Sequence, residues 1–409
     1  MQQAVTRPDL ISLAAGLVDE ASLPVDETRE SIVQLLGDPA AARRALQYGT
    51  TQGSQRLREL AVEHLERVEG CSAREMGLSA DKLVVTTGSQ QMLELIAEAL
   101  LDPGDIVLVG APDYFVFMGN IDCAGATAVG VAMDEDGVVP EALVHTLDGL
   151  DRAGSLDRVK LLYCTSYHQN PTGVTLAAER RPVILEIIRR WSTAGRIFIL
   201  EDAAYRELSY GEASPRSIRS YDERGETVIL SQTFSKSFAP GMKTGYSVLP
   251  DELLAPVLRI KGNHDFGSSN FVQHLLASVM ATGRYAEHVE KLRSVYRHKL
   301  AATLDAVEAE FNRHGVPAHW TRPDGGLYVW IALPESLDTT LAGPLFRRSV
   351  DKGVMYVPGE FCFPSGWNGS ASGPLGGPRN TMRLCFGVPP IAKLREGVAR
   401  LAAAVAEQH

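Results

Sequence analysis

The chain has 409 residues, of which 45% are hydrophobic and 22% charged, the composition of an ordinary globular protein rather than a disordered one. The 40 Lys and Arg against 50 Asp and Glu leave a net charge of −10, which argues against a nucleic-acid or membrane-surface partner, because both are bound mainly by Lys and Arg. No apolar run approaches the roughly 18 residues of a membrane helix, and neither C-x-x-C nor H-E-x-x-H predicts a metal site.

The five cysteines are scattered along the chain, at positions 71, 123, 164, 362 and 385. An odd number without a pairing pattern favours free thiols in a reducing compartment over a disulfide framework. The first residues, Met1-Gln2-Gln3-Ala4, lack the basic and apolar segments of a signal peptide. We therefore expect a cytoplasmic protein.

Strands and helices alternate from about residue 80 to residue 250. Apolar runs predict buried strands at 82–87, 106–109, 159–164, 196–200 and 228–231. Helical spacing follows the first of them, at Met92, Leu95, Ile96 and Ala99. Apolar strands separated by helices are typical of a mostly parallel sheet that is covered on both faces. A further strand at 244–249 is expected at an edge of this sheet.

The C-terminal third has a different pattern. We expect helices at 269–282 and 284–313, the second of them long and amphipathic. Shorter strands are expected at 327–333, 354–357 and 382–386, and a closing helix after Pro389-Pro390. These elements predict a smaller α+β domain over 286–409, after a large domain over 46–285. Residues 1–45 are expected to pack against the smaller domain, and the Gly- and Ser-rich stretch 364–378 to form a loop.

Polar residues follow several of the predicted strands, which is where open α/β sheets bind their ligands. A Gly88-Ser89 turn opens the first helix, and its backbone N–H groups suit a phosphate, although Ser89 could equally be an ordinary helix N-cap. Asn170 lies in an N-P-T-G sequence, which is also a common turn. Asp202 ends a predicted strand, where a carboxylate has a cationic partner or a catalytic task, unless it simply begins a helix.

The most informative stretch is 231–246, with the sequence SQTFSKSFAPGMKTGY. Its lysine, Lys236, lies among small hydroxyl and aromatic residues before a Pro-Gly turn. Desolvation in such surroundings lowers the pKa of an ammonium group and frees the amine for a Schiff base. The alternative, as for any single lysine, is a surface position.

The motif T-F-S-K-x-x-x-P-G-x-K-x-G-Y, with D-x-x-Y and N-P-T-G before it, resembles the class I/II aminotransferases of pyridoxal-phosphate (PLP) fold type I. Within them the chain is most similar to the kynurenine and 2-aminoadipate aminotransferase group, from the segment at Ile11 to Met382-Arg383-Leu384. The resemblance implies an α/β fold, with a mostly parallel seven-stranded sheet in a large domain and a smaller α+β domain. It also implies PLP as the cofactor and a homodimer with shared active sites.

The resemblance implies roles for single residues as well. Lys236 would form the Schiff base with PLP and move the proton at the substrate α-carbon, and Asp202 would pair with the pyridinium nitrogen. Arg383 would bind the substrate α-carboxylate with its two-pronged guanidinium. Further cofactor contacts would come from Asn170, Tyr205 and Tyr114 at the ring, from Ser89, Gln90, Thr233 and Ser235 at the phosphate, and from Tyr48 of the neighbouring subunit. Gly16 and Asn170 would face the substrate.

Two departures from the family pattern bear on the ligands. Lys243 stands where the family usually has Arg, and it would keep the positive charge but lose the bidentate geometry. We therefore expect phosphate binding with weaker retention of the cofactor. The N-terminal helix that often carries a second substrate-recognising Arg has no counterpart before Ile11, which leaves a dicarboxylate preference without a residue to support it.

We expect a PLP-dependent aminotransferase that moves an amino group from an aromatic, aminoadipate-like or large aliphatic α-amino acid to a 2-oxo acid. The same fold type also supports decarboxylation, β-elimination and oxidative deamination. A non-catalytic sensor, as in regulators with an aminotransferase-like domain, is disfavoured because no DNA-binding segment precedes Ile11 and the chain is acidic.

Aromatic residues near these motifs are candidates for a substrate pocket: Tyr114, Phe115, Phe117, Phe361, Phe363 and Trp367. For at least half of them we expect ordinary core packing instead. His168 precedes Asn170 and lies either near the cofactor or on the surface.

Overall fold

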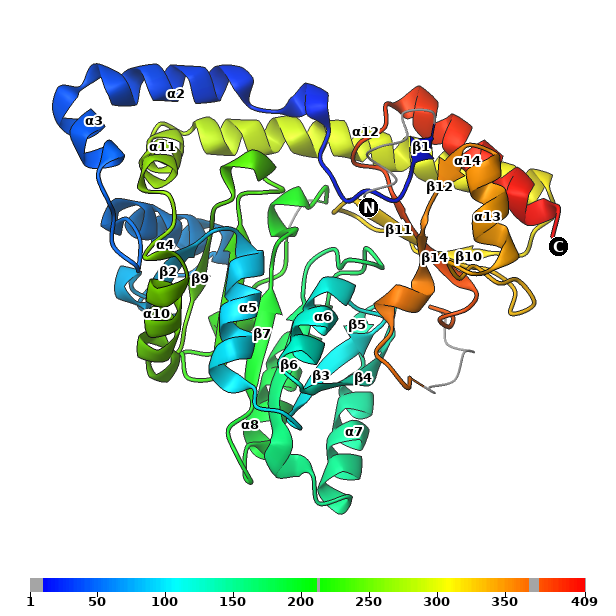
Figure 1. Cartoon of the computed structure of the whole chain (residues 1–409), viewed down its shortest axis with the longest axis horizontal. Coiled ribbons are helices and arrows are strands. Elements are labelled where there is room, and N and C mark those ends of the chain that lie inside the picture. Colours follow the sequence, from blue (N-terminus) through cyan, green and yellow to red (C-terminus); the bar gives the residue numbers. More distant parts are fainter. Residues whose placement is uncertain (1–9, 212–213, 368–374, 409) are drawn as a thin grey trace.

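The computed structural model describes residues 10–211, 214–367 and 375–408. Figure 1 shows a large central sheet flanked by helices and a second, smaller sheet beside it. Among the described helices, none combines the length and the apolar character that a membrane crossing requires.

The central sheet has the strand order β2-β9-β8-β7-β6-β3-β4-β5. Its strands are β2 Leu83–Thr86, β3 Ile106–Ala111, β4 Thr127–Asp134, β5 Gly137–Val138, β6 Val159–Thr165, β7 Phe198–Asp202, β8 Val228–Thr233 and β9 Gly245–Val248. Strand β9 runs antiparallel to both of its neighbours and β5 runs antiparallel to β4, whereas the remaining neighbouring pairs are parallel. The sheet is therefore mostly parallel, as expected.

Two details of this sheet differ from the expectation. Strand β9 is not at an edge, because it is hydrogen-bonded between β2 and β8. The sheet also has one strand more than the expected seven, because the two-residue β5 folds back on β4. Strand β4 itself was not predicted, although its sequence TAVGVAMD is largely apolar, and the structure shows it only partly buried.

Helices cover both faces of the central sheet. One face carries α5 Ser89–Leu100, α6 Phe115–Cys123 and α10 Asp251–Asp265. The other carries α4 Gln55–Glu69, α7 Pro140–Arg152, α8 Arg180–Trp191, the short α9 Ile218–Tyr221 and α11 Asn270–Ala281. Successive side chains of β3 point to opposite faces of the sheet. Leu108 packs with α7 and α8, and Val109 packs with α5 and α6. Because these strands are buried on both faces of the sheet, their sequences are continuous apolar runs.

The smaller sheet is antiparallel, with the order β10-β11-β14-β13. Its strands are β10 His319–Trp320, β11 Tyr328–Ala332, β13 Val357–Pro358 and β14 Thr381–Cys385. The long helix α12 Arg284–Arg313 and the closing helix α14 Ile391–Ala406 pack on it, and α13 Pro344–Asp351 lies beside α14. The expected strand at 354–357 divides in two, because β12 Val354–Met355 pairs with β1 rather than with this sheet.

The segment that precedes the central sheet has two sets of neighbours. Strand β1 Ile11–Ser12 pairs in parallel with β12, next to the smaller sheet. Helices α2 Val25–Gly37 and α3 Pro39–Leu46 instead pack on α11, through Leu35, Ala45 and Leu275. In Figure 1, α2 extends from the neighbourhood of β1 toward α11, so this segment runs along both parts of the molecule.

Buried ion pairs hold the loops that follow the strands. Glu69, at the end of α4, pairs with Arg206, which lies just after β7, and both side chains are only 1% exposed. The guanidinium of Arg206 also lies over the ring of Tyr167, 5.0 Å from its centroid. This pair therefore connects α4 to the chain segments that follow β6 and β7.

We predict that Glu69→Gln lowers the free energy of unfolding by about 3–5 kcal/mol, because it removes the ion-pair partner of the buried Arg206. The amide keeps the size of the side chain and can still accept the hydrogen bond from the Ser217 N–H. Urea denaturation followed by circular dichroism measures the effect. Asp26→Asn is the control, since its pair with Arg29 is exposed and is worth less than about 1 kcal/mol. Equal effects of the two substitutions would contradict the prediction.

Candidate active site

Five strands of the central sheet, β2, β3, β6, β7 and β8, direct their carboxyl ends toward one cavity of about 250 Å³. Arg383 from β14 and Gly16 from the segment after β1 complete its wall. The expected site residues that line it are Gly16, Ser89, Gln90, Tyr114, Asn170, Asp202, Tyr205, Thr233, Ser235, Lys236, Lys243 and Arg383. The structure thus brings together residues from distant parts of the chain at the sheet edge where α/β proteins bind ligands.

Tyr48 is the expected site residue that lies outside this cavity. Its side chain is 84% exposed, and its ring packs edge-on against Phe266 with a centroid separation of 5.8 Å. Its contribution to a neighbouring subunit stays a prediction.

Lys236 follows β8, and its Nζ donates a hydrogen bond of 2.8 Å to the backbone oxygen of Gly16. Burial lowers the pKa of this amine, and the positive charges of Arg383 and Lys243 act in the same direction. The amine thus points into the protein and loses its proton more readily than an exposed lysine. The alternative of a surface position does not hold.

Asp202 is the last residue of β7 and is buried. Its carboxylate accepts hydrogen bonds of 3.0 Å from the Tyr163 hydroxyl and from the Ala204 N–H. Burial raises the pKa of this carboxyl group to about 6, and within the described residues it forms no ion pair. Asp202 therefore ends a strand and does not begin a helix, and it is a buried acid without a cationic partner.

Arg383 is the opposite case, a buried guanidinium without an anionic partner in the described part of the chain. Its Nη1 donates to Asn170 Oδ1 at 2.6 Å and its Nη2 to the Ala14 oxygen at 2.7 Å, whereas its Nε has no partner there. Asn170 is thus more than a turn residue, because it holds the arginine. The arrangement leaves an uncompensated positive charge facing the cavity.

The loop between β2 and α5 and the loop after β8 form a polar end of the cavity. Gly88 has φ 76°, a conformation that favours glycine, and is itself the N-cap residue of α5, so Ser89 is not the N-cap. The first turn of α5 therefore has free N–H groups at this end. Thr233 Oγ1 donates to Ser235 Oγ at 2.9 Å, and Lys243 lines the same cavity. Two hydroxyls, a helix N-terminus and a lysine suit a phosphate.

Sequence reasoning missed two tyrosines of this cavity. Tyr163 in β6 donates to Asp202, and Tyr328 in β11 bonds to Tyr205 and lies under Arg383, with 4.4 Å between its ring centroid and the Arg383 Cζ. Both tyrosines lie within strands that the apolar pattern predicted. A tyrosine in a strand that is otherwise apolar indicates that its hydroxyl has a hydrogen-bond partner. The identity of that partner depends on how distant strands pair, which the local sequence does not give.

The aromatic candidates for a substrate pocket divide as expected. Tyr114 and Phe115 line the cavity. Phe117 and Phe363 are buried in the hydrophobic core, and Trp367 packs against it. Phe361 is 44% exposed and is not among the residues that line the cavity.

His168 lies neither at the cavity nor on the surface. It is 1% exposed, and its Nδ1 lies 3.0 Å from Thr175 Oγ1 and 3.3 Å from Asp324 Oδ1. A Cβ on Gly325 would lie 2.3 Å from its ring, so the imidazole packs tightly against the loop that leads to β11.

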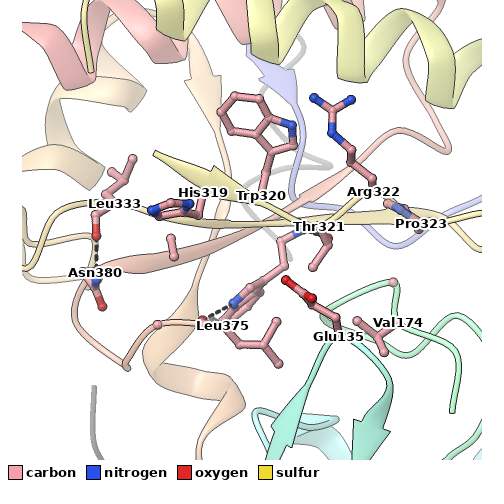
Figure 2. A pocket seen from close by; sticks show the side chains of 14 residues that line it. Glu135, Val174, His319, Trp320, Thr321, Arg322, Pro323, Leu333, Leu375 and Asn380 are labelled. Atoms are coloured by element: carbon pink, nitrogen blue, oxygen red, sulfur yellow. Dashed lines mark hydrogen bonds between the residues drawn. The ribbon is translucent and has the colours of Figure 1, made fainter. Parts of the chain in front are cut away.

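A larger cavity, of about 620 Å³, lies below β10 (Figure 2). None of the expected site residues is among the described residues that line it. Asn380 and Trp330, two of its polar residues, bond to backbone oxygens of Leu333 and Leu375. The candidate active site is therefore not the larger cavity but the smaller one, which contains the unpaired charges and the expected residues.

Comparisons with known proteins agree with this geometry. Residues 8–401 match the family model of aminotransferase class I and II. The aromatic-amino-acid aminotransferase 1 of Thermococcus litoralis is 34% identical over 99% of this chain and 90% of its own length, and the 2-aminoadipate transaminase of Thermus thermophilus is 31% identical over 98% and 91%. The structure of Pyrococcus horikoshii kynurenine aminotransferase superposes with a TM-score of 0.87 at 32% identity, over 99% of this chain and 93% of that one. The chain belongs to the class I and II aminotransferases.

Proposed function

We propose that this aminotransferase binds PLP in the cavity at the strand ends, and that it moves an amino group from an aromatic, aminoadipate-like or large aliphatic α-amino acid to a 2-oxo acid. One observation carries the proposal. The cavity combines the buried amine of Lys236, a carboxylate without a cation and a guanidinium without an anion, as far as the described residues extend.

The donors and acceptors of the cavity fit PLP group by group. The protonated pyridine nitrogen would supply the cation that Asp202 lacks, since an opposite charge stabilises a buried carboxylate. The first turn of α5, with Ser89 and Gln90, would bind the phosphate from one side, and Thr233, Ser235 and Lys243 from the other. When bound, PLP supplies an aldehyde carbon that reacts with amines and a ring that accepts the electron pair released at the substrate α-carbon.

The protein residues would orient the substrate and move its proton. Arg383 binds the α-carboxylate through two parallel hydrogen bonds, and Asn170 holds the guanidinium in place. The amine of Lys236 would then accept the proton of the α-carbon and deliver it to the cofactor, a role that suits a lysine whose pKa is lowered by burial. The ring oxygen would receive hydrogen bonds from Asn170 and Tyr205, and Tyr114 would lie against the ring face.

The apolar wall of the cavity supports the aromatic and large aliphatic side chains of the proposed range. Leu17, Phe115 and Val116 line it. Such a wall favours a substrate with an apolar side chain, since burying apolar area releases free energy. The names of two relatives, an aromatic-amino-acid aminotransferase and a 2-aminoadipate transaminase, support aromatic and aminoadipate donors.

The proposal includes a division of each chain into a large domain over 46–285 and a small domain over 286–409. It also includes a homodimer as the active unit. Leu46, Tyr48 and Phe266 are large apolar residues that line a common surface hollow and are 61–84% exposed. An exposed apolar group of this kind supports contact with a second copy of the chain, which would bring Tyr48 to the neighbouring phosphate.

Lys236→Ala should abolish both transamination and the visible absorption of the bound cofactor, because its amine, which donates to the Gly16 oxygen at the cavity, is the one that would join the cofactor covalently. Absorption spectra after incubation with PLP and a coupled assay for the 2-oxo acid product measure the two effects. Lys393→Ala on the exposed face of α14 is the control and should behave as the unsubstituted protein. Turnover in the Lys236 variant would remove the proposal.

A panel of amino donors tests the substrate range. Aromatic, 2-aminoadipate and large aliphatic donors should react faster than alanine or aspartate, with 2-oxoglutarate or pyruvate as the acceptor. Because amino-group transfer needs an acceptor, the steady formation of the donor's 2-oxo acid should stop when the acceptor is left out. Acceptor-independent formation of keto acid, or release of carbon dioxide, would identify a different PLP reaction.

Asp202→Asn should stabilise the cofactor-free protein at high pH. The folded-state pKa of Asp202, about 6, exceeds the value of about 3.9 in an unfolded chain, so its ionisation destabilises the fold as the pH rises from about 4 through 6. The amide removes this penalty, which predicts a gain of about 3 kcal/mol at pH 8 and less than about 0.5 kcal/mol at pH 4. Urea denaturation at the two pH values measures it. A gain of the same size at both would show that the charge is not its cause.

A further inference from the structure

We propose that Tyr328 is a positioning residue with two separate tasks in the proposed site: its hydroxyl directs the proton of Tyr205 toward the cofactor, and its ring supports Arg383. This inference rests on the proposed function. Tyr328 begins β11 of the smaller sheet, whereas Tyr205 follows β7 of the central sheet, so the pair joins the two parts of the molecule at the cavity.

The two phenols form an isolated hydrogen-bonded pair. Their oxygens are 2.8 Å apart, the rings meet edge to face at 78°, and neither hydroxyl has another partner among the described residues. Burial raises the pKa of both phenols, that of Tyr328 to about 12, so both are protonated at neutral pH. Two hydroxyl protons and one shared hydrogen bond leave one proton free for a ligand.

The surroundings decide which proton is free. A Cβ on Gly16 would lie only 2.6 Å from the Tyr328 oxygen, so the backbone of this loop covers that hydroxyl. Tyr328 therefore donates to Tyr205, and Tyr205 keeps its own proton for an oxygen in the cavity. A hydroxyl that accepts one hydrogen bond is a stronger donor in the next, because neighbouring hydrogen bonds polarise one another.

The ring of Tyr328 has a different neighbour. The Arg383 Cζ lies 4.4 Å from the ring centroid, within the range of a cation–π contact. Together with the bonds to Asn170 and Ala14, this contact holds the guanidinium that would bind the substrate carboxylate. The Tyr328 hydroxyl thus affects the hydrogen bond to the cofactor, and its ring affects the position of the arginine that would bind the substrate. Different substitutions of Tyr328 can test the two effects separately.

Tyr328→Phe removes the hydroxyl and keeps the ring. The pH titration of the visible band of the PLP-loaded protein should shift upward by about half a unit to one unit, because a cofactor oxygen with a weaker hydrogen bond keeps more negative charge and favours a proton beside it. The KM for the amino donor should change less than about twofold, since Arg383 keeps its support. Tyr328→Leu should show the same shift and raise the KM about tenfold.

Tyr356→Phe is the matched control. Tyr356 is equally buried and bonds to the Thr339 oxygen, outside the residues that line the cavity, so its loss should leave the titration unchanged. An unshifted titration in Tyr328→Phe, or equal KM values in the Phe and Leu variants, would overturn the inference. If Tyr328→Leu does not fold, the titration of the Phe variant decides alone. Failure of the proposed function would look different, since the unsubstituted protein would then show no visible band.

Discussion

The proposed site depends on two buried charges that the described protein leaves without an opposite partner. Asp202 and Arg383 lie in one cavity, and burial of either charge costs free energy that hydrogen bonds offset only in part. A ligand that carries a cation at one end and a carboxylate at the other removes both costs at once. The two unpaired charges therefore favour binding of such a ligand. The amine of Lys236 lies in the same cavity, where it could react with that ligand.

Two pairs of buried charges elsewhere in the fold neutralise each other. Glu69 pairs with Arg206, and Glu201 lies 3.7 Å from Arg181, with all four side chains at most 1% exposed. The first pair connects α4 to the loop after β7, and the second connects α8 to β7 itself. Pairing at these positions stabilises the framework, whereas Asp202 and Arg383 face the cavity, where a ligand would supply the opposite charges.

Much of this architecture could be predicted from local patterns. Apolar runs mark the strands that are buried on both faces, and the motifs at 88–90, 170–173, 202–205 and 233–246 all lie at strand ends, as the alternation of strands and helices predicts. Two strands of the sheet were not predicted correctly. Strand β4 was missed although its sequence is largely apolar, and the structure shows it only partly buried. The edge position expected for β9 was wrong because the residues of a strand do not record whether it pairs on one side or on two.

The sequence by itself determined the type of the large sheet, the helices with a long apolar stripe and the chemistry of most site residues, because these depend on spacing within a few turns or strands. Tertiary structure alone decided which groups meet. Four distant segments of the chain supply Gly16, Tyr205, Tyr328 and Arg383. Their contacts depend on how the small antiparallel sheet packs against the ends of the central strands. That packing is set by the burial of side chains from both parts, which no short stretch of sequence encodes.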